Sequence, residues 1–221
     1  MALVAAVFDI DGTLVTFEFD VRGTRAAIIE ELSKRGFDTA GLDMTTPTQE
    51  MIDSARMQVE SGKVRAKFDE VRAALYSILD ASEMESSRTT SVFPGTRKTL
   101  DYLRSKSVRL GVLTNSGRRA AAEVLRRAGL QDCFEFVLCR DDVAMMKPRP
   151  DGLVRAISML GMPRDQIFYV GDSRYDILAA KQAGLKVVGV PTGNYDEAKL
   201  REEGADYVIS SISELPGLLG V

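Results

Sequence analysis

Four groups of polar residues follow apolar runs in this sequence, and each contains side chains suited to metal or phosphate chemistry. The first is VFDIDGTL, from Val7 to Leu14, where Asp9 and Asp11 stand two residues apart at the end of an apolar run. Two carboxylates this close repel each other unless a cation or a proton intervenes. Carboxylate oxygens suit Mg²⁺. The motif predicts either an acidic metal site or, as the alternative, a turn that caps a strand.

The second group ends the run GVLTNSG, from Gly111 to Gly117, and consists of Thr114, Asn115 and Ser116. Hydroxyl groups and free backbone N–H groups at the start of a helix bind phosphate well. The same residue types are also common helix N-caps. Taken alone, the motif fits phosphate binding and helix capping equally well.

The third and fourth groups add a lysine and a second pair of carboxylates. Lys147 stands in MKPRPD, and a lone lysine there could equally be a solvated surface residue. Asp172 follows the apolar run that ends in VGDSRYD, and Asp176 comes four residues later near a predicted helix start, where it could serve as a cap. Because a parallel sheet gathers the carboxyl ends of its strands at one edge, the four groups together indicate one site.

Short β-branched runs alternate with helical patterns and predict the elements that position these groups. The strand candidates are Leu3–Asp9, Val108–Thr114, Phe134–Cys139, Ile167–Gly171, Lys186–Val190 and Tyr207–Ile209. The helix candidates are Gly95–Lys106, Gly117–Ala128, Asp151–Leu160, Tyr175–Ala183 and Tyr195–Glu203. Near-continuous apolar strands in alternation with helices predict an α/β fold with a doubly wound parallel sheet.

One segment, residues 16–90, shows helical patterns and no convincing strand. Ala26, Ile29 and Leu32 share one face of a predicted helix. A second stripe, with a spacing of three to four residues, consists of Val64, Phe68, Val71, Leu75 and Leu79. We expect three or four packed helices inserted after the first strand. The predicted domains are a core of residues 1–15 and 91–221 and a helical insert of residues 16–90.

Composition excludes several other kinds of site. The chain has 221 residues, no histidine, and 29 basic against 32 acidic residues. Without histidine, Ser-His-Asp catalysis, Cys-His catalysis and His-ligated zinc are excluded. The near balance of charge gives no indication of nucleic acid binding, and no apolar run approaches the roughly 18 residues of a membrane span. We expect Cys133 and Cys139 to be buried and reduced, which favours a cytoplasmic protein.

The motifs together resemble those of the haloacid dehalogenase superfamily in both order and spacing. These motifs are DxDGT at Asp9–Thr13, Thr114 after an apolar strand, Lys147-Pro148, and GDSxxD at Gly171–Asp176. The insert resembles the helical cap of the phosphoglycolate phosphatase-like branch. The resemblance implies a Rossmann-like core with a helical cap, and a phosphatase that hydrolyses a small phosphorylated metabolite.

The resemblance also implies catalytic and metal-binding roles. Asp9 would attack phosphorus and become the aspartyl phosphate. Asp11 would protonate the leaving oxygen and then activate the water that releases phosphate. The cofactor would be Mg²⁺, bound by the carboxylate of Asp9, the main-chain carbonyl of Asp11 and Asp172.

Further residues would hold the substrate, again by resemblance. Thr114 and Asn115 would bind the phosphoryl oxygens with help from neighbouring backbone N–H groups, and Lys147 would balance their charge. Asp176 would orient Lys147 or a metal-bound water and would not bind the metal itself.

Departures from the family patterns narrow the choice of branch. Hydrolytic dehalogenases lack the second aspartate of the first motif, so Asp11 favours phosphate chemistry. Thr13 and the absence of histidine disfavour the β-phosphoglucomutase branch. Lys63 and Lys67 keep open the phosphonate-cleaving branch, which needs a cap lysine that forms a Schiff base. Thr16 stands where many phosphatases of the branch have an acidic residue, so their substrate preferences do not transfer directly.

Two alternatives of other classes remain. A phosphotransferase or phosphomutase would use the same intermediate, and a catalytically silent phosphate-binding protein would keep the site without turnover. The sequence predicts neither a single substrate nor an oligomeric state.

Overall fold

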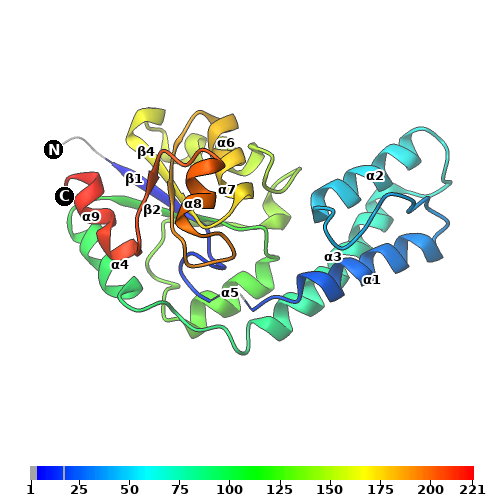
Figure 1. The fold of residues 1–221 in the computed structure, drawn as a ribbon, viewed down its shortest axis with the longest axis horizontal. Helices are drawn as coiled ribbons and strands as arrows, with labels where there is room; N and C mark the ends of the chain where they lie inside the picture. Colours follow the sequence, from blue (N-terminus) through cyan, green and yellow to red (C-terminus); the bar gives the residue numbers. More distant parts are fainter. Residues whose placement is uncertain (1–3, 17) are drawn as a thin grey trace. The chain divides into compact units, whose positions relative to one another are not determined.

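A computed structural model describes residues 4–16 and 18–221 (Figure 1). Leu3, where the first predicted strand begins, and Phe17, in the predicted insert, lie outside the described residues. Six strands form one parallel sheet in the order β3-β2-β1-β4-β5-β6. They are β1 (Ala5–Phe8), β2 (Arg109–Leu113), β3 (Phe136–Leu138), β4 (Ile167–Gly171), β5 (Lys186–Gly189) and β6 (Tyr207–Val208). Each lies within its predicted bounds, and the predicted fold class is confirmed.

Helices cover both faces of this sheet. One layer consists of α4 (Thr96–Ser105), α5 (Arg118–Arg127) and α9 (Leu215–Leu219). The other layer consists of α6 (Asp151–Leu160), α7 (Arg174–Ala183) and α8 (Glu197–Glu202). Single 3-10 turns occur at Arg140–Asp142, Arg164–Gln166 and Ile212–Glu214. The predicted helices are found within one or two residues of their expected ends. Helix α9 was not predicted, because Pro216 and Gly217 in so short a stretch indicate a turn.

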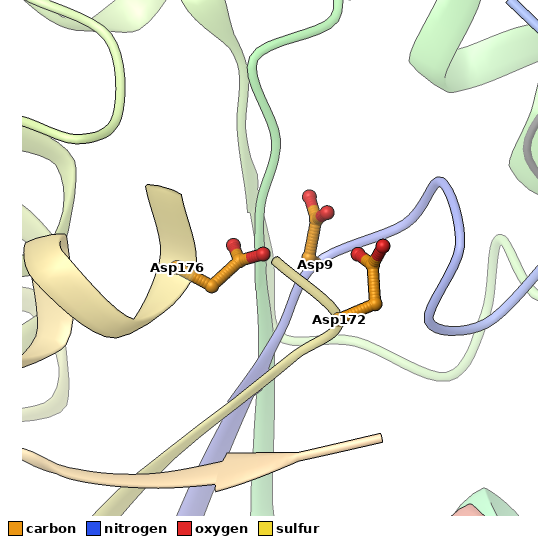
Figure 2. Close-up of side chains that lie close together, drawn as sticks. All are labelled: Asp9, Asp172 and Asp176. Atoms are coloured by element: carbon orange, nitrogen blue, oxygen red, sulfur yellow. The ribbon is translucent and has the colours of Figure 1, made fainter. Parts of the chain in front are cut away.

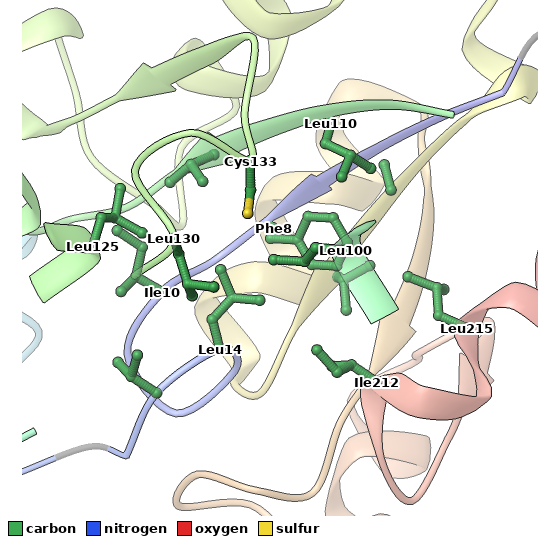
Figure 3. Packing of buried hydrophobic residues seen from close by; sticks show 14 of the residues in the cluster. Phe8, Ile10, Leu14, Leu100, Leu110, Leu125, Leu130, Cys133, Ile212 and Leu215 are labelled. Carbon is green, nitrogen blue, oxygen red and sulfur yellow. The ribbon is translucent and has the colours of Figure 1, made fainter. Parts of the chain in front are cut away.

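The side chains of β1 point alternately to the two faces of the sheet, and this explains why helices cover both faces. Ala6 and Phe8 belong to the core that α4, α5 and α9 cover, and Phe8 lies there with Leu100 and Leu110 (Figure 3). Ala5 and Val7 belong to the other core. Successive side chains of a strand point to opposite faces, so a strand buried on both sides is apolar at every position.

Residues 18–88 form a compact unit of their own, separate from the rest of the described chain. It contains α1 (Val21–Lys34), α2 (Thr48–Glu60) and α3 (Phe68–Ser86). In α3 the predicted stripe is buried at Val71, Leu75 and Leu79, whereas Val64 precedes the helix. No helix of the described residues is long and apolar enough to cross a membrane.

The predicted buried face of α1 is wrong in part. The helix buries Thr24, Ile28 and Leu32, while Ala26 is exposed and Ile29 half-buried. This face also carries a polar contact that periodicity does not reveal. Thr24 Oγ1 donates a hydrogen bond to Ser82 Oγ of α3 over 2.7 Å, which satisfies a hydroxyl at a core position.

A close contact between β2 and β3 allows a test of how these two strands pack in the sheet. Gly111 pairs with Phe136, and a Cβ added at Gly111 would lie 2.2 Å from Cζ of that ring. We expect Gly111→Ala to lower the free energy of unfolding by about 1–3 kcal/mol, because the ring or the strand must shift. Urea unfolding measures this loss. In the double variant with Phe136→Leu the loss should be smaller than the sum of the two single losses; strict additivity would contradict the contact.

Candidate active site

The predicted polar groups meet at one edge of the sheet. Strand β1 pairs with both β2 and β4, so the carboxyl ends of these three strands are neighbours. Asp9, Thr114 and Asp172 are the residues that directly follow them. The chain runs from β1 outward to β3 and then returns to β4 on the other side, so the order of the strands reverses beside β1. Ligands of open α/β sheets bind at such a point.

Three buried carboxylates form a cluster at this edge. Oxygens of Asp9, Asp172 and Asp176 lie within 4.8 Å of one another (Figure 2). Asp9 continues the alternation of Ala5 and Val7, which turns it toward the face that α7 covers, and α7 carries Asp176.

Burial raises the pKa of two of these carboxyl groups. The pKa of Asp9 rises to about 7, because burial and the neighbouring Asp176 outweigh the lowering effect of Lys147. Burial, followed by the charges of Asp176 and Asp9, raises the pKa of Asp172 well above its usual value. The ionised cluster therefore needs compensating positive charge.

Lys147 supplies part of that charge. Its Nζ lies 2.8 Å from Asp9 Oδ1 and 2.7 Å from Asp176 Oδ1, and it donates to the hydroxyl of Tyr169 over 2.9 Å. An ammonium group has three N–H donors, so each has a partner here. Burial alone would lower the pKa of Lys147, but the charges of Asp176 and Asp9 hold it above its ordinary value.

Asn115 holds the main chain of Lys147. Its Nδ2 donates to the carbonyl of Lys147 over 3.0 Å, and its Oδ1 accepts from the N–H of Lys147 over 2.9 Å. The side-chain amide thus joins the end of β2 to the lysine loop. The predicted contact between Asn115 and substrate stays a prediction, and the structure adds this positioning contact to it.

Both oxygens of Asp176 are engaged within the protein. Oδ1 accepts from Lys147 and from the hydroxyl of Tyr169, and Oδ2 accepts from the N–H and the hydroxyl of Ser173 at 3.1 and 2.5 Å. The contacts with Ser173 form the capping box at the start of α7. Although Asp176 belongs to the acidic cluster, these bonds favour the predicted role in orienting Lys147 over a role as a metal ligand.

Asp11 has a different setting from Asp9. It is half-buried, and its Oδ2 accepts a hydrogen bond from Ser116 Oγ over 2.8 Å. Gly12 has a φ of +82°, which glycine adopts readily, and this turns the chain after Asp11. The carboxylate of Asp11 is therefore directed toward the second motif.

Thr114 is buried at the end of β2, and its hydroxyl is oriented locally. The oxygen accepts the N–H of Ser116 over 3.0 Å. A hydroxyl that accepts one hydrogen bond still has a proton to donate to an anionic oxygen.

Tyr169 is the site residue that sequence reasoning missed. It is fully buried in β4, and its hydroxyl oxygen accepts from Lys147. The hydroxyl donates to Asp176 Oδ1 over 2.9 Å, and the carbonyl of Leu113, at 3.2 Å, is a second acceptor within reach. Burial and the nearby carboxylates raise the pKa of Tyr169 well above its usual value, so the hydroxyl keeps its proton. The available signal was a tyrosine in an otherwise apolar strand, because a buried tyrosine hydroxyl needs a partner.

These residues fit a divalent cation. One ammonium group faces three buried carboxylates, and a divalent cation would offset the two remaining negative charges. Since both oxygens of Asp176 are engaged, Asp9 and Asp172 would supply the side-chain ligands. Hard carboxylate oxygens of this kind suit Mg²⁺ or a similar ion.

The family model described as haloacid dehalogenase-like hydrolase matches residues 6–190. The chain is 32% identical to the phosphoglycolate phosphatase of Pseudomonas fluorescens strain Pf0-1, over 96% of this chain and 79% of that protein. It is 31% identical to the phosphoglycolate phosphatase of Neisseria meningitidis serogroup A, over 96% of this chain and 91% of that protein.

Solved structures agree with these relatives. The crystal structure of a hydrolase from Pseudomonas syringae has a TM-score of 0.73 and 26% identity, and the alignment covers 99% of each chain. A structure described as a predicted phosphoglycolate phosphatase from Haemophilus somnus has a TM-score of 0.68 at 20% identity, which shows the fold alone, over 99% of this chain and 98% of that one.

The chain belongs to the haloacid dehalogenase-like hydrolases. The predicted family, fold and class of enzyme, a phosphatase of this family, are confirmed. The roles of the individual residues and the identity of the metal stay predictions.

The buried hydroxyl of Tyr169 gives a test of the polar cluster. Tyr169→Phe removes a partner of both Lys147 and Asp176, and an unsatisfied buried polar group costs about 1–3 kcal/mol. We expect a loss of that size in the free energy of unfolding, measured in urea. The matched control is Tyr102→Phe, at a side chain that is 43% exposed, where the change should stay within about 0.5 kcal/mol. Equal effects of the two substitutions would contradict the contact.

Proposed function

We propose that this phosphatase hydrolyses a small phosphomonoester with the help of Mg²⁺ and passes through an aspartyl phosphate on Asp9. The observation that carries the proposal is the setting of the Asp9 carboxylate. It lies at the carboxyl end of β1, 2.8 Å from the ammonium of Lys147 and in one cluster with Asp172. A nucleophilic carboxylate needs such compensation, because it must approach a phosphoryl group of like charge.

Positive charge at the site favours the ionised form of Asp9 and opposes the effect of burial. Burial raises the pKa of Asp9 to about 7, and the charge of Lys147 offsets this rise only in part. A cation bound by Asp9 and Asp172 would favour the ionised, nucleophilic form further. When bound, Mg²⁺ would supply charge neutralisation and Lewis-acid polarisation of the phosphoryl oxygen.

The different settings of Asp9 and Asp11 support different roles. Asp9 is buried and paired with Lys147, whereas Asp11 is half-buried and fixed by the hydroxyl of Ser116. Asp11 is therefore suited to give a proton to the leaving oxygen and to accept one from water afterwards. The hydroxyl of Thr114, at the next strand end, would donate to a phosphoryl oxygen, and Asn115 holds the main chain of the lysine loop.

The relatives suggest which substrate to test first. Two that are 31–32% identical over most of the chain are named phosphoglycolate phosphatase. We propose phosphoglycolate, or a similarly small phosphomonoester, as the substrate. A panel of phosphorylated metabolites would rank it, and the ratio of free phosphate to phosphorylated acceptor would separate hydrolysis from transfer.

Residues 18–88 are proposed to act as a cap whose motion opens and closes the site. Support comes from their compact, separate packing and from the position of every matched motif outside them. The amines of Lys63 and Lys67 are exposed and paired with Asp38 and Glu70, at 2.8 and 3.4 Å. These exposed ion pairs do not favour a Schiff-base lysine and so give no support to phosphonate cleavage.

We also propose a cytoplasmic location. Cys133 and Cys139 are buried free thiols, which suits a reducing compartment. Absence of nucleic acid binding stays a prediction from the balanced charge.

The first test of this function removes the nucleophile. Asp9→Asn should abolish turnover while the circular dichroism spectrum stays unchanged, because an amide cannot form the acyl phosphate. Residual activity within about tenfold of wild type, a barrier change of about 1.4 kcal/mol, would falsify the assignment.

The metal requirement is tested by chelation and by thermal unfolding. Activity should stop in excess chelator and return with Mg²⁺. Mg²⁺ at 100 times its dissociation constant should stabilise the wild type by about 2.7 kcal/mol, and Asp172→Asn should lose most of this effect. The control is Asp165→Asn, at an exposed aspartate, which should respond to Mg²⁺ like the wild type. Full turnover in chelator would contradict the metal role.

The role of Asp11 is tested with two leaving groups. Asp11→Asn should slow phosphorylation of the enzyme by an alkyl phosphate at least about a hundredfold, the typical loss of general acid–base help. p-Nitrophenyl phosphate should suffer less, because its leaving group needs little protonation. Single-turnover measurements compare the two substrates, and equal losses for both would count against an acid role.

A further inference from the structure

The carboxylate of Asp172 lies between two glycines from distant parts of the chain. A Cβ added at Gly193, in the segment after β5, would lie 1.7 Å from Asp172 Oδ2 and 2.6 Å from its Cγ. A Cβ added at Gly12 would lie 2.6 Å from the same Oδ2. Neither glycine therefore leaves room for a Cβ beside the carboxylate.

The two glycines are needed for different reasons. Gly12 has a φ of +82°, a conformation that favours glycine whatever surrounds it. Gly193 does not have a left-handed φ, so its backbone conformation is open to other residues. The three atoms nearest to a Cβ added at Gly193 all belong to Asp172, so this side chain is the first obstacle that an added Cβ meets.

The segment that carries Gly193 is tied to both neighbouring strand ends. Thr192 Oγ1 donates to the carbonyl of Gly12 over 2.6 Å, and the N–H of Val190 donates to the carbonyl of Gly171 over 2.9 Å. On its other side, Asp172 Oδ1 accepts from Thr13 Oγ1 over 3.3 Å. These contacts limit how far the segment or the carboxylate can move without loss of a hydrogen bond.

We propose that Thr192 and Gly193 are positioning residues for the metal site, and that they fix the Asp172 carboxylate in the orientation that binds the cation. This inference rests on the proposed metal role of Asp172. A side chain at Gly193 must either rotate that carboxylate or push the segment away from Gly12. Either movement displaces a ligand group, and groups that orient ligands typically contribute 10–100-fold to metal affinity.

The test measures Mg²⁺ binding by titration calorimetry without substrate. Gly193→Ala should raise the dissociation constant of Mg²⁺ at least about tenfold. Its melting temperature in chelator measures separately how much the close contact itself destabilises the fold, because no cation is then bound. The matched control is Gly217→Ala, which has an ordinary φ and nothing within 4 Å of the added Cβ, and it should bind Mg²⁺ like the wild type.

A second pair of variants tests the tether and covers a failure of Gly193→Ala to fold. Thr192→Val should weaken Mg²⁺ binding, and Thr192→Ser, which keeps the hydroxyl, should restore most of it. Wild-type affinity in Gly193→Ala, or in Thr192→Val where Gly193→Ala does not fold, would overturn the inference and leave the proposed function intact. A wild type that binds no Mg²⁺ would instead overturn the metal role and this inference with it.

Discussion

The rest of the site depends on the two ion pairs that the buried ammonium group of Lys147 forms with Asp9 and Asp176. A buried ion pair gains stability only when its geometry is good and its remaining donors and acceptors are satisfied. Tyr169 takes the third N–H of the ammonium group, and Asn115 holds the lysine main chain. The parallel order of β1, β2 and β4 brings these residues to one edge of the sheet.

The cluster holds three carboxylates and one ammonium group, and this excess of negative charge relates the fold to the proposed chemistry. Lys147 offsets part of the charge of the three clustered carboxylates, and burial keeps the pKa of Asp9 and Asp172 raised. A divalent cation would complete the compensation and leave Asp9 ionised as a nucleophile. Asp11 is half-buried, its carboxylate accepts a hydrogen bond from Ser116, and its charge adds to the rise in the pKa of Asp9.

The sequence predicted the strands, the main helices and the edge where the motifs meet, because apolar runs and their polar ends reflect burial directly. It did not predict Tyr169, nor the contact of Gly193 with Asp172. Which side chains touch depends on crossovers between strands, and periodicity within one segment carries no information about them. The predicted buried face of α1 is wrong in part for the same reason, since it depends on packing against another helix, where Thr24 bonds to Ser82.

The most direct test of the account locates the phosphoryl group on the enzyme. The Asp11→Asn variant should still accept phosphate from p-nitrophenyl phosphate but hydrolyse the intermediate slowly, so phosphorylated enzyme should accumulate. Acid quenching followed by tandem mass spectrometry should find the phosphoryl group on Asp9. A phosphoryl group on any other residue would contradict the account.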